Sequence, residues 1–272
     1  MGTFRPGRAL IALAAAGAVL AGVGVIFWDP RFKSEWAPDV AASTITADDL
    51  TKASKVTVYF SHMSVGQNIM SGVNALYAAK GVRHPTVVSA ERDQSVSVPD
   101  GGIIDVMVGD NGHPRWKLAT YDRALRAGLA KDVDVAILKF CYLDINWRTN
   151  VEEIFSLYKS TLDALEKDFP NVRFLHSTVP LRVGPDGIKD YIKAVIGRDD
   201  NDARNRYNAL LRAAYPAEQI FDVAAIESTA PDGASLTTLY PGYSDDGSHL
   251  NPSGSSLVAS VLLKKLAAMA PA

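Results

Sequence analysis

Two short polar blocks, far apart in the chain, contain the residue types that nucleophilic chemistry at a serine requires. The first, "FSHMSVGQN" (residues 60–68), places Ser64 between an apolar, β-rich stretch and a helical one. The second, "DDGSHLN" (residues 245–251), places Asp246 and His249 three positions apart before the last helical stretch. A serine hydroxyl is a poor nucleophile unless an imidazole accepts its proton and a carboxylate orients that imidazole. The order Ser, Asp, His therefore indicates a hydrolytic site.

Each block has a simpler interpretation when it is taken alone. A serine at a strand-to-helix turn is usually a helix N-cap, and an Asp-Gly loop with a histidine is usually only a turn. Both blocks in one chain, in this order, are harder to explain by these simpler roles. At such a turn the backbone N–H of Ser64 would also lie at a helix N-terminus, where it can stabilise an oxyanion.

The elements that must position these blocks alternate along the chain. Short, β-branched apolar runs are typical of strands buried on both faces, and they occupy residues 55–60, 86–90, 102–107, 133–140, 172–180 and 219–223. Stretches with apolar positions three and four apart are typical of helices, and they occupy residues 66–81, 114–131, 151–169, 202–215 and 251–269. This alternation predicts a three-layer α/β/α domain with a central parallel sheet.

Ligands of such domains bind at the carboxyl ends of the strands. Three segments should therefore meet at one edge of the sheet: residues 61–68, "VGDNGHP" at residues 108–114 and "KFCYLDIN" at residues 139–146. Within the last of these, Lys139 and Asp144 could form an ion pair or contact substrate.

The N-terminus carries a segment that differs from the rest. Arg5 and Arg8 precede about twenty uncharged residues, 9–28, which are enough to cross a bilayer as a helix. We predict that residues 1–28 are a transmembrane anchor or, alternatively, a cleaved signal segment, that residues 29–54 are a linker, and that residues 55–272 form the domain. Basic residues before the apolar run place the domain outside the cytoplasm, in the periplasm or at the cell surface.

Composition excludes several other classes of function. A formal charge of -2, without Lys/Arg runs, argues against a nucleic-acid surface. Cys141 is the only cysteine, so no intramolecular disulfide and no cysteine zinc site can form, and we expect a buried, inert thiol there. No phosphate-binding or dinucleotide-binding glycine pattern follows a predicted strand. The sequence therefore predicts neither a cofactor nor a metal.

The two polar blocks resemble the first and last blocks of the SGNH (GDSL-type) hydrolases. This resemblance implies a flavodoxin-like α/β fold, with Ser64 as nucleophile, His249 as general base and Asp246 as its orienting partner. "VGDNG" is similar to the family's second block, so the resemblance implies that the N–H groups of Ser64 and Gly109 bind the oxyanion, with Gly112 as the alternative to Gly109. It also implies an esterase that acts on an ester, typically O-acetyl, of a carbohydrate or cell-envelope polymer.

The chain departs from the family pattern at two places. His62 and Met63 stand where the family usually has Gly and Asp, and the third-block Asn that donates to the oxyanion is missing after residues 133–138. Asn111 or Tyr142 would have to replace that donor. The departures leave two alternatives open: a non-catalytic glycan-binding or assembly domain with the same fold, and an acyltransferase that uses the same serine. An α/β-hydrolase is disfavoured because its motif needs Gly at position 62.

Overall fold

A computed structural model describes residues 44–90, 101–185, 188, 192, 195–196 and 198–271 of the 272-residue chain. The predicted anchor or signal segment and most of the predicted linker lie outside the described residues. Within the part of the chain that is described, no helix is both long enough and apolar enough to span a membrane.

The centre of the domain is a six-stranded sheet, and every neighbouring pair of strands in it is parallel. The strands follow the spatial order β2-β3-β1-β4-β5-β6. Their bounds are β1 Val58–His62, β2 Val87–Ala90, β3 Ile103–Met107, β4 Val135–Leu138, β5 Arg173–Ser177 and β6 Ile220–Phe221. Each lies within or overlaps one of the predicted apolar runs, which confirms the predicted parallel sheet.

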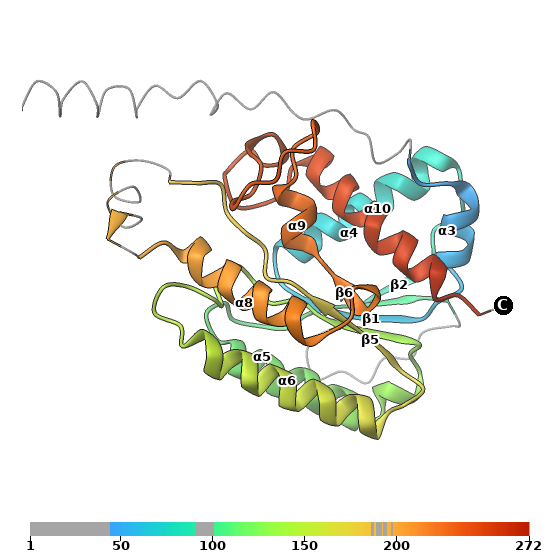
Figure 1. The fold of residues 1–272 in the computed structure, drawn as a ribbon. Helices are drawn as coiled ribbons and strands as arrows, with labels where there is room; N and C mark the ends of the chain where they lie inside the picture. The colour runs from blue at the N-terminus through green and yellow to red at the C-terminus, as the bar shows by residue number, and fades with distance from the viewer. Residues whose placement is uncertain are drawn as a thin grey trace, which may run out of the picture. The chain divides into compact units, whose positions relative to one another are not determined.

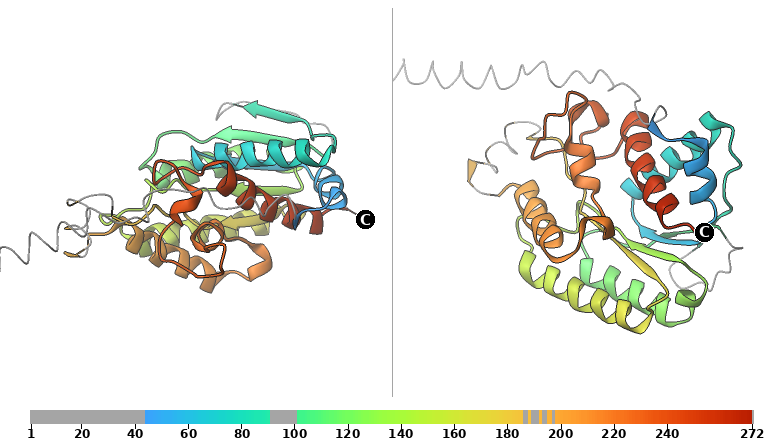
Figure 2. Two further views of the ribbon diagram at one scale, coloured as in Figure 1. Left: turned by 90° about the horizontal axis from the view of Figure 1, so that it is seen from above. Right: turned by 45° about the vertical axis from the view of Figure 1, so that its right-hand side comes forward.

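Helices cover both faces of this sheet (Figures 1 and 2). One layer contains α3 Ala47–Ala53, α4 Val65–Lys80, α9 Val223–Ser228 and α10 Pro252–Ala268, and the other contains α5 Pro114–Arg126, α6 Val151–Asp168 and α8 Asp200–Ala214. Three-residue 3-10 turns lie at η2 Leu129–Lys131, η3 Ala217–Gln219 and η4 Pro241–Tyr243. The arrangement is the predicted three-layer α/β/α fold.

Alternate residues of each strand enter different hydrophobic cores. In β4, Val135 and Ile137 pack in the core beneath α4 and α10, whereas Ala136 and Leu138 pack in the core beneath α5, α6 and α8. Successive side chains of a strand point to opposite faces, and both faces here are covered. This is why the strands are almost continuously apolar.

Helix α3 lies inside the stretch predicted as a linker, residues 29–54. Thr46 caps it with a reciprocal capping box with Asp49, and Leu50 is fully buried in the core. The Tyr77 hydroxyl donates to the Leu50 carbonyl at 2.9 Å. The helix has only seven residues, which is too short for an apolar period to stand out in the sequence. All the described residues, from Thr44 to Pro271, belong to one packed unit.

Close packing of α4 against α10 brings the two polar blocks to the same end of the sheet. A Cβ atom at Gly72 of α4 would lie 2.2 Å from the Ser255 carbonyl oxygen of α10, so only glycine permits this approach. Asn251 caps α10 by accepting from the Gly254 N–H at 3.0 Å, and Pro252 occupies the first helical position. Helix α4 begins just after Ser64, and α10 begins shortly after His249.

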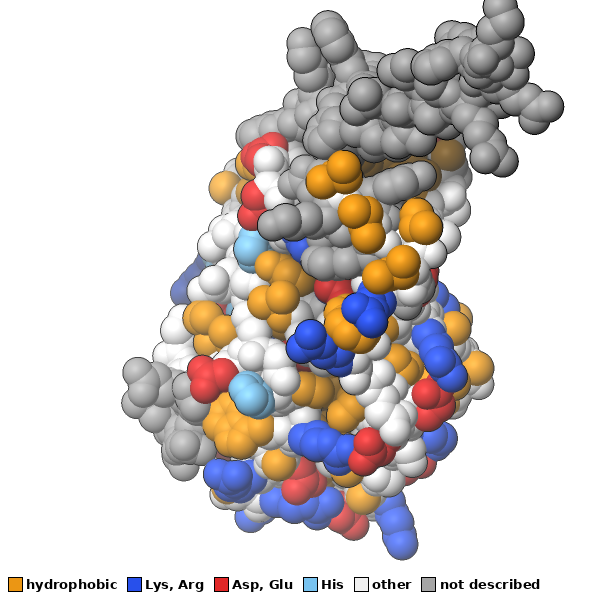
Figure 3. All heavy atoms as spheres, turned by 90° about the vertical axis from the view of Figure 1, so that its left-hand side faces the viewer, with side chains coloured by type: hydrophobic (Ala, Val, Ile, Leu, Met, Phe, Trp, Pro, Cys, Tyr) orange, Lys and Arg blue, Asp and Glu red, His pale blue; other side chains and the backbone are white. Residues whose placement is uncertain are grey.

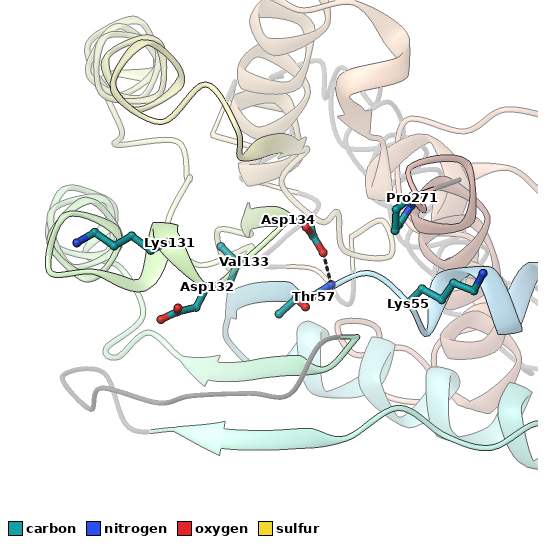
Figure 4. A pocket seen from close by; sticks show the side chains of 7 residues that line it. All are labelled: Lys55, Thr57, Lys131, Asp132, Val133, Asp134 and Pro271. Carbon is teal, nitrogen blue, oxygen red and sulfur yellow. Dashed lines mark hydrogen bonds between the residues drawn. The ribbon is translucent and has the colours of Figure 1, made fainter.

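A pocket of about 420 Å³ lies at the opposite, amino-terminal edge of the sheet. Figure 4 shows Asp134, which precedes β4, pointing toward Thr57, which precedes β1. The Thr57 N–H donates to the Asp134 carboxylate at 2.8 Å. Lys55, Lys131 and Asp132 also line the pocket. This charged edge is distinct from the edge at which the predicted site lies.

Candidate active site

The candidate site lies where the order of the strands changes direction. Strand β1 is paired with β3 on one side and with β4 on the other. The connection that leaves β1 runs through α4 on one face of the sheet, whereas those that leave β3 and β4 run through α5 and α6 on the other face. The connections of β1 and β4 therefore diverge, and such a switch point opens the crevice in which α/β domains bind ligands. Ser64 follows β1 at this point. The structure thus places at one edge of the sheet the three segments that were predicted to meet there, residues 61–68, 108–114 and 139–146.

The Ser64 hydroxyl is not used to cap the helix it precedes. Ser64 occupies the N-cap position of α4, yet its side chain makes no capping hydrogen bond. Its Oγ lies 3.9 Å from the buried Cys141 Sγ, and the residue is half-buried. The simpler interpretation of this serine as an N-cap is therefore not supported, and the hydroxyl remains available for chemistry.

Asp246 and His249 are in direct contact. The Asp246 Oδ2 atom lies 2.7 Å from the His249 Nδ1, while its Oδ1 accepts from the backbone N–H groups of Ser248 and His249 at 2.8 and 2.7 Å. Partial burial raises the pKa of Asp246, but these hydrogen bonds outweigh it and lower that pKa to about 2. The carboxylate is therefore ionised and fixed, and the His249 Nε2 is the ring atom left for a proton transfer.

Two contacts tie the His249 loop to the rest of the site, one to the first block and one to the segment after β4. The Leu250 N–H donates to the Asn68 Oδ1 on the first turns of α4 at 3.3 Å. The Tyr142 ring meets the His249 ring edge-on, with 5.8 Å between centroids. Among the described contacts, no hydrogen bond joins the Ser64 Oγ to the His249 ring. Catalytic hydrogen bonds are often long in ligand-free structures and tighten when substrate binds.

The oxyanion candidates differ in whether their N–H groups are already occupied. The Gly112 N–H donates to the Asp144 Oδ1 at 2.7 Å, so it is used within the protein. The N–H groups of Ser64 and Gly109 have no acceptor among the described residues. Gly109 has a φ of 99°, a conformation that glycine adopts without strain. Gly109 therefore fits the role of oxyanion donor better than Gly112.

Asn111 belongs to a buried charge network that the sequence reasoning missed. The Lys117 Nζ donates to both oxygens of Asp144, at 2.9 and 2.7 Å, and to the Asn111 Oδ1 at 2.9 Å. Both side chains of the Lys117–Asp144 pair are fully buried. Because Lys117 holds the Asn111 carbonyl oxygen, the amide N–H₂ group of Asn111 is left to donate elsewhere.

The sequence did contain a signal for this pair. Lys117 stands four positions before Tyr121 and eight before Leu125, so it occupies the buried stripe of α5. A charged residue on such a stripe needs a buried partner. Asp144, four residues after the end of the predicted apolar core of β4, supplies it and also accepts from the Cys141 N–H at 2.7 Å.

Replacing Asp144 by Ala should destabilise the domain by about 3–5 kcal/mol, because the Lys117 ammonium would be buried without its partner. Thermal unfolding followed by circular dichroism should show a fall of roughly 10 °C or more. The double variant Lys117→Met with Asp144→Leu is the control and should recover much of the loss, since no unpaired charge remains. A single variant that loses less than about 1 kcal/mol would contradict the assigned pair.

The suggested pair of Lys139 with Asp144 is not formed. Lys139 is completely buried, and its Nζ donates to the Phe140 carbonyl at 3.2 Å. Burial lowers the pKa of Lys139 to about 8 and raises the pKa of the buried Glu227 to about 8. The Glu227 carboxylate accepts from the Leu181 N–H. Both side chains are buried, and Glu227 holds the backbone of the connection after β5.

His62 has a packing role. Its ring is fully buried at the end of β1 and contacts the Asp105 carboxylate through Nε2. Burial lowers the pKa of His62, although the Asp105 contact opposes this effect. A Cβ at Gly66 would lie 2.2 Å from the ring. His62 therefore fills the space beneath the first turn of α4 and supports the Ser64 turn from below.

Arg182 is a further residue of the site for which the sequence carried no signal. Its Nε donates to the Ser248 Oγ at 2.8 Å, and its guanidinium lies 6.0 Å from the centre of the Tyr142 ring. The next residue, Val183, donates its N–H to the Gly247 carbonyl at 3.0 Å. The connection after β5 thus holds the loop that carries His249.

Comparison with known proteins gives structural likeness only. No protein-family model and no curated protein matches the sequence. A candidate platelet activating factor from Streptococcus pneumonia is similar in structure at 15% identity, with 96% of this chain and 100% of that chain covered and a TM-score of 0.50.

Two weaker likenesses have TM-scores below that value. One is to a candidate lipolytic protein of the G-D-S-L family from Desulfitobacterium hafniense, at 10% identity over 77% of this chain and 99% of that chain, with a TM-score of 0.45. The other is to an acetylxylan esterase from Geobacillus stearothermophilus, at 13% identity over 78% and 94% of the two chains, with a TM-score of 0.39. At such identities the likeness concerns the fold alone, and that fold is the three-layer α/β/α arrangement that the resemblance to the SGNH (GDSL-type) hydrolases implied.

Proposed function

We propose that this protein is a serine esterase that works through an acyl-serine intermediate. The observation that carries the proposal is a Ser64 hydroxyl free of capping at the switch point of the sheet, with an Asp246–His249 pair held at the same edge. Neither block would need this arrangement as a simple turn or cap.

The chemistry runs in two balanced steps. The His249 Nε2 accepts the proton of the Ser64 hydroxyl as Oγ attacks the ester carbonyl carbon, and the proton then passes to the departing alcohol as the C–O bond breaks. Water attacks the acyl-Ser64 in the same way, giving a carboxylic acid and the free serine. Asp246 keeps the Nδ1 atom protonated throughout, because its carboxylate accepts from that nitrogen.

The substrate proposal is an O-acetyl or similar short acyl ester on a carbohydrate or cell-envelope polymer. It is supported by the resemblance of the two polar blocks and by the predicted export of the domain, as a membrane-anchored or released protein. An acyltransferase would form the same acyl-Ser64 and pass it to a sugar hydroxyl, whereas a glycan-binding domain would form no acyl-enzyme.

A covalent probe and a product assay test the proposal together. A fluorophosphonate should label the protein once, at Ser64, and the wild type should release acetate from p-nitrophenyl acetate and from acetylated glycans. Acetate transferred to an added sugar instead of to water would assign transfer. Absence of both labelling and turnover in a folded protein would leave a glycan-binding domain.

Asn111 is the proposed replacement for the missing oxyanion donor. Asn111→Ala should lower kcat by about 10²–10³ with little change in KM, because the lost hydrogen bond forms only in the transition state. Asn111→Asp is the matched variant, since it keeps an oxygen for Lys117 but cannot donate, and it should lose as much. Full activity of Asn111→Asp in steady-state assays would remove Asn111 from the oxyanion site and favour Tyr142.

A further inference from the structure

The exposed large apolar side chains are not spread evenly over the domain. Nine occur among the described residues, at 37–69% exposure; Met107 ends β3, and the other eight lie in connections that follow a strand. Four lie at the end of β3 or in the connections after β3 and β4: Met107, Trp116, Leu143 and Trp147. Figure 3 looks at this end of the domain and shows hydrophobic side chains beside Lys and Arg side chains. The opposite edge carries the charged pocket of Figure 4.

Four more belong to the connection between β5 and α8, and they have helical spacing. Ile188, Ile192, Val195 and Ile196 stand at positions i, i+4, i+7 and i+8, which share one face of a helix. The Ile196 N–H donates to the Ile192 carbonyl at 3.1 Å, as in a helical turn. Their exposed fractions lie between 46% and 69%. A stripe of aliphatic side chains this exposed normally marks an interaction surface.

Trp147 adds a feature that points to the chemistry of the partner. Its ring is flanked by two exposed guanidiniums, Arg148 at 4.7 Å and Arg198 at 4.8 Å from the ring centroid. An indole beside cationic groups, next to aliphatic side chains, is the combination found in segments that lie in the interface of a bilayer. The indole and aliphatic groups enter the acyl boundary, while guanidiniums bind phosphate.

The predicted anchor would bring such a surface within reach of a bilayer. If residues 9–28 cross the membrane as the sequence predicts, only residues 29–43 separate them from the described domain. Fifteen extended residues span at most about 50 Å. An anchored domain would therefore stay close to the lipid headgroups.

We propose that eight exposed side chains dock the domain onto a phospholipid bilayer. These side chains, here called the apolar rim, are Met107, Trp116, Leu143, Trp147, Ile188, Ile192, Val195 and Ile196. The rim lies at the same edge of the sheet as Ser64 and His249. Docking through it would place the candidate active site at the membrane surface, where a substrate carried by lipid or by an envelope polymer close to the membrane could reach it.

Vesicle flotation of residues 35–272 tests this docking without the predicted anchor. All six strands and both hydrophobic cores lie within these residues, so the fragment retains the complete packed unit. The wild-type fragment should float with vesicles of phosphatidylcholine and phosphatidylglycerol. Leu143→Ser with Trp147→Ser, and separately Ile192→Ser with Ile196→Ser, should each weaken binding at least about tenfold, because two inserted side chains are lost.

The control is Lys55→Gln with Lys131→Gln at the opposite, charged edge, which should float like the wild type. Melting temperatures of all variants should stay near that of the wild type, since the replaced side chains are exposed. The proposal is overturned if the wild type does not float, if both rim variants float unchanged, or if the control loses binding. A wild-type dimer in sedimentation that the rim variants turn into monomer, without flotation, would assign the rim to a second copy of the chain instead.

Discussion

Replacing Ser64 or His249 by Ala should lower ester hydrolysis by about 10⁴–10⁶-fold, because nucleophile and base act as one unit. The double variant should lose no more than either single one. Hydrolysis of p-nitrophenyl acetate, followed by absorbance, measures the loss. The Ser64→Ala protein should also fail to react with a fluorophosphonate.

Matched residues of the same type serve as controls. Ser71 is an exposed serine on α4 whose hydroxyl donates to the Gln67 carbonyl at 3.0 Å, and Ser71→Ala should keep full turnover. His84, in the loop after α4, contacts the Pro85 carbonyl, and His84→Ala should keep it as well. Wild-type rates in a folded Ser64→Ala protein would refute the acyl-serine mechanism.

Asp246→Asn should cut turnover by about 10²–10⁴-fold while the loop keeps its shape. The Asn Oδ1 atom can still accept from the Ser248 and His249 N–H groups, which Asp246 bonds at 2.8 and 2.7 Å. The charge that orients and stabilises the His249 imidazolium is lost, and the wrong tautomer becomes accessible. Steady-state kinetics from mildly acidic to alkaline pH measure the effect.

The pH dependence of stability provides a second readout for Asp246. Its pKa is about 2 in the folded protein against a reference value of 3.8. A lowered folded-state pKa contributes stability that is full above about 3.8 and is lost as the pH falls through about 2. The melting-temperature difference between wild type and Asp246→Asn should therefore be constant above about pH 4 and shrink below it. Since the carboxylate is largely solvent-exposed, the difference should be small.

Asp245→Asn is the neighbouring control and should keep wild-type turnover. The contrary result is that Asp246→Asn retains full activity, with an unchanged fall of the rate at acidic pH, while Asp245→Asn loses its activity. In that case the orienting role would belong to Asp245. Both carboxylates sit in the same loop, so the two variants separate the role of one residue from the general charge of the loop.

The central sheet could be predicted from the sequence because its cause is local. Strands covered on both faces must be apolar at nearly every position, as in residues 133–138, and helices between them must carry an apolar stripe. Helix α3 was not predicted in this way. Seven residues make about two turns, and Leu50 and Ala53 show an apolar stripe only once α10 and Tyr77 are packed against them.

Some features of the candidate site could likewise be predicted from the sequence, and others could not. Ser64, Asp246 and His249 could be proposed as catalytic residues from the sequence because residue type, order and spacing carry the chemistry, and the observed Asp246–His249 contact spans only three residues. The partner of Asp144 could not be chosen from the sequence. Lys117 lies on the buried stripe of α5 and Lys139 just after a buried strand, and only the fold shows which ammonium lies within 3 Å of the carboxylate. The choice of Gly109 over Gly112 likewise depends on Asp144 having taken the Gly112 N–H.

The sequence by itself thus determined the fold class, the alternation of strands and helices, and the three residues proposed for catalysis, since each depends on local pattern or short spacing. Only the tertiary structure decided that Lys117 pairs with Asp144 near the site and that the Gly109 N–H has no acceptor among the described residues. It also decided that the exposed apolar side chains gather at the edge that holds Ser64. These features join residues tens of positions apart, and their energies depend on burial, which arises only when helices and sheet are packed together.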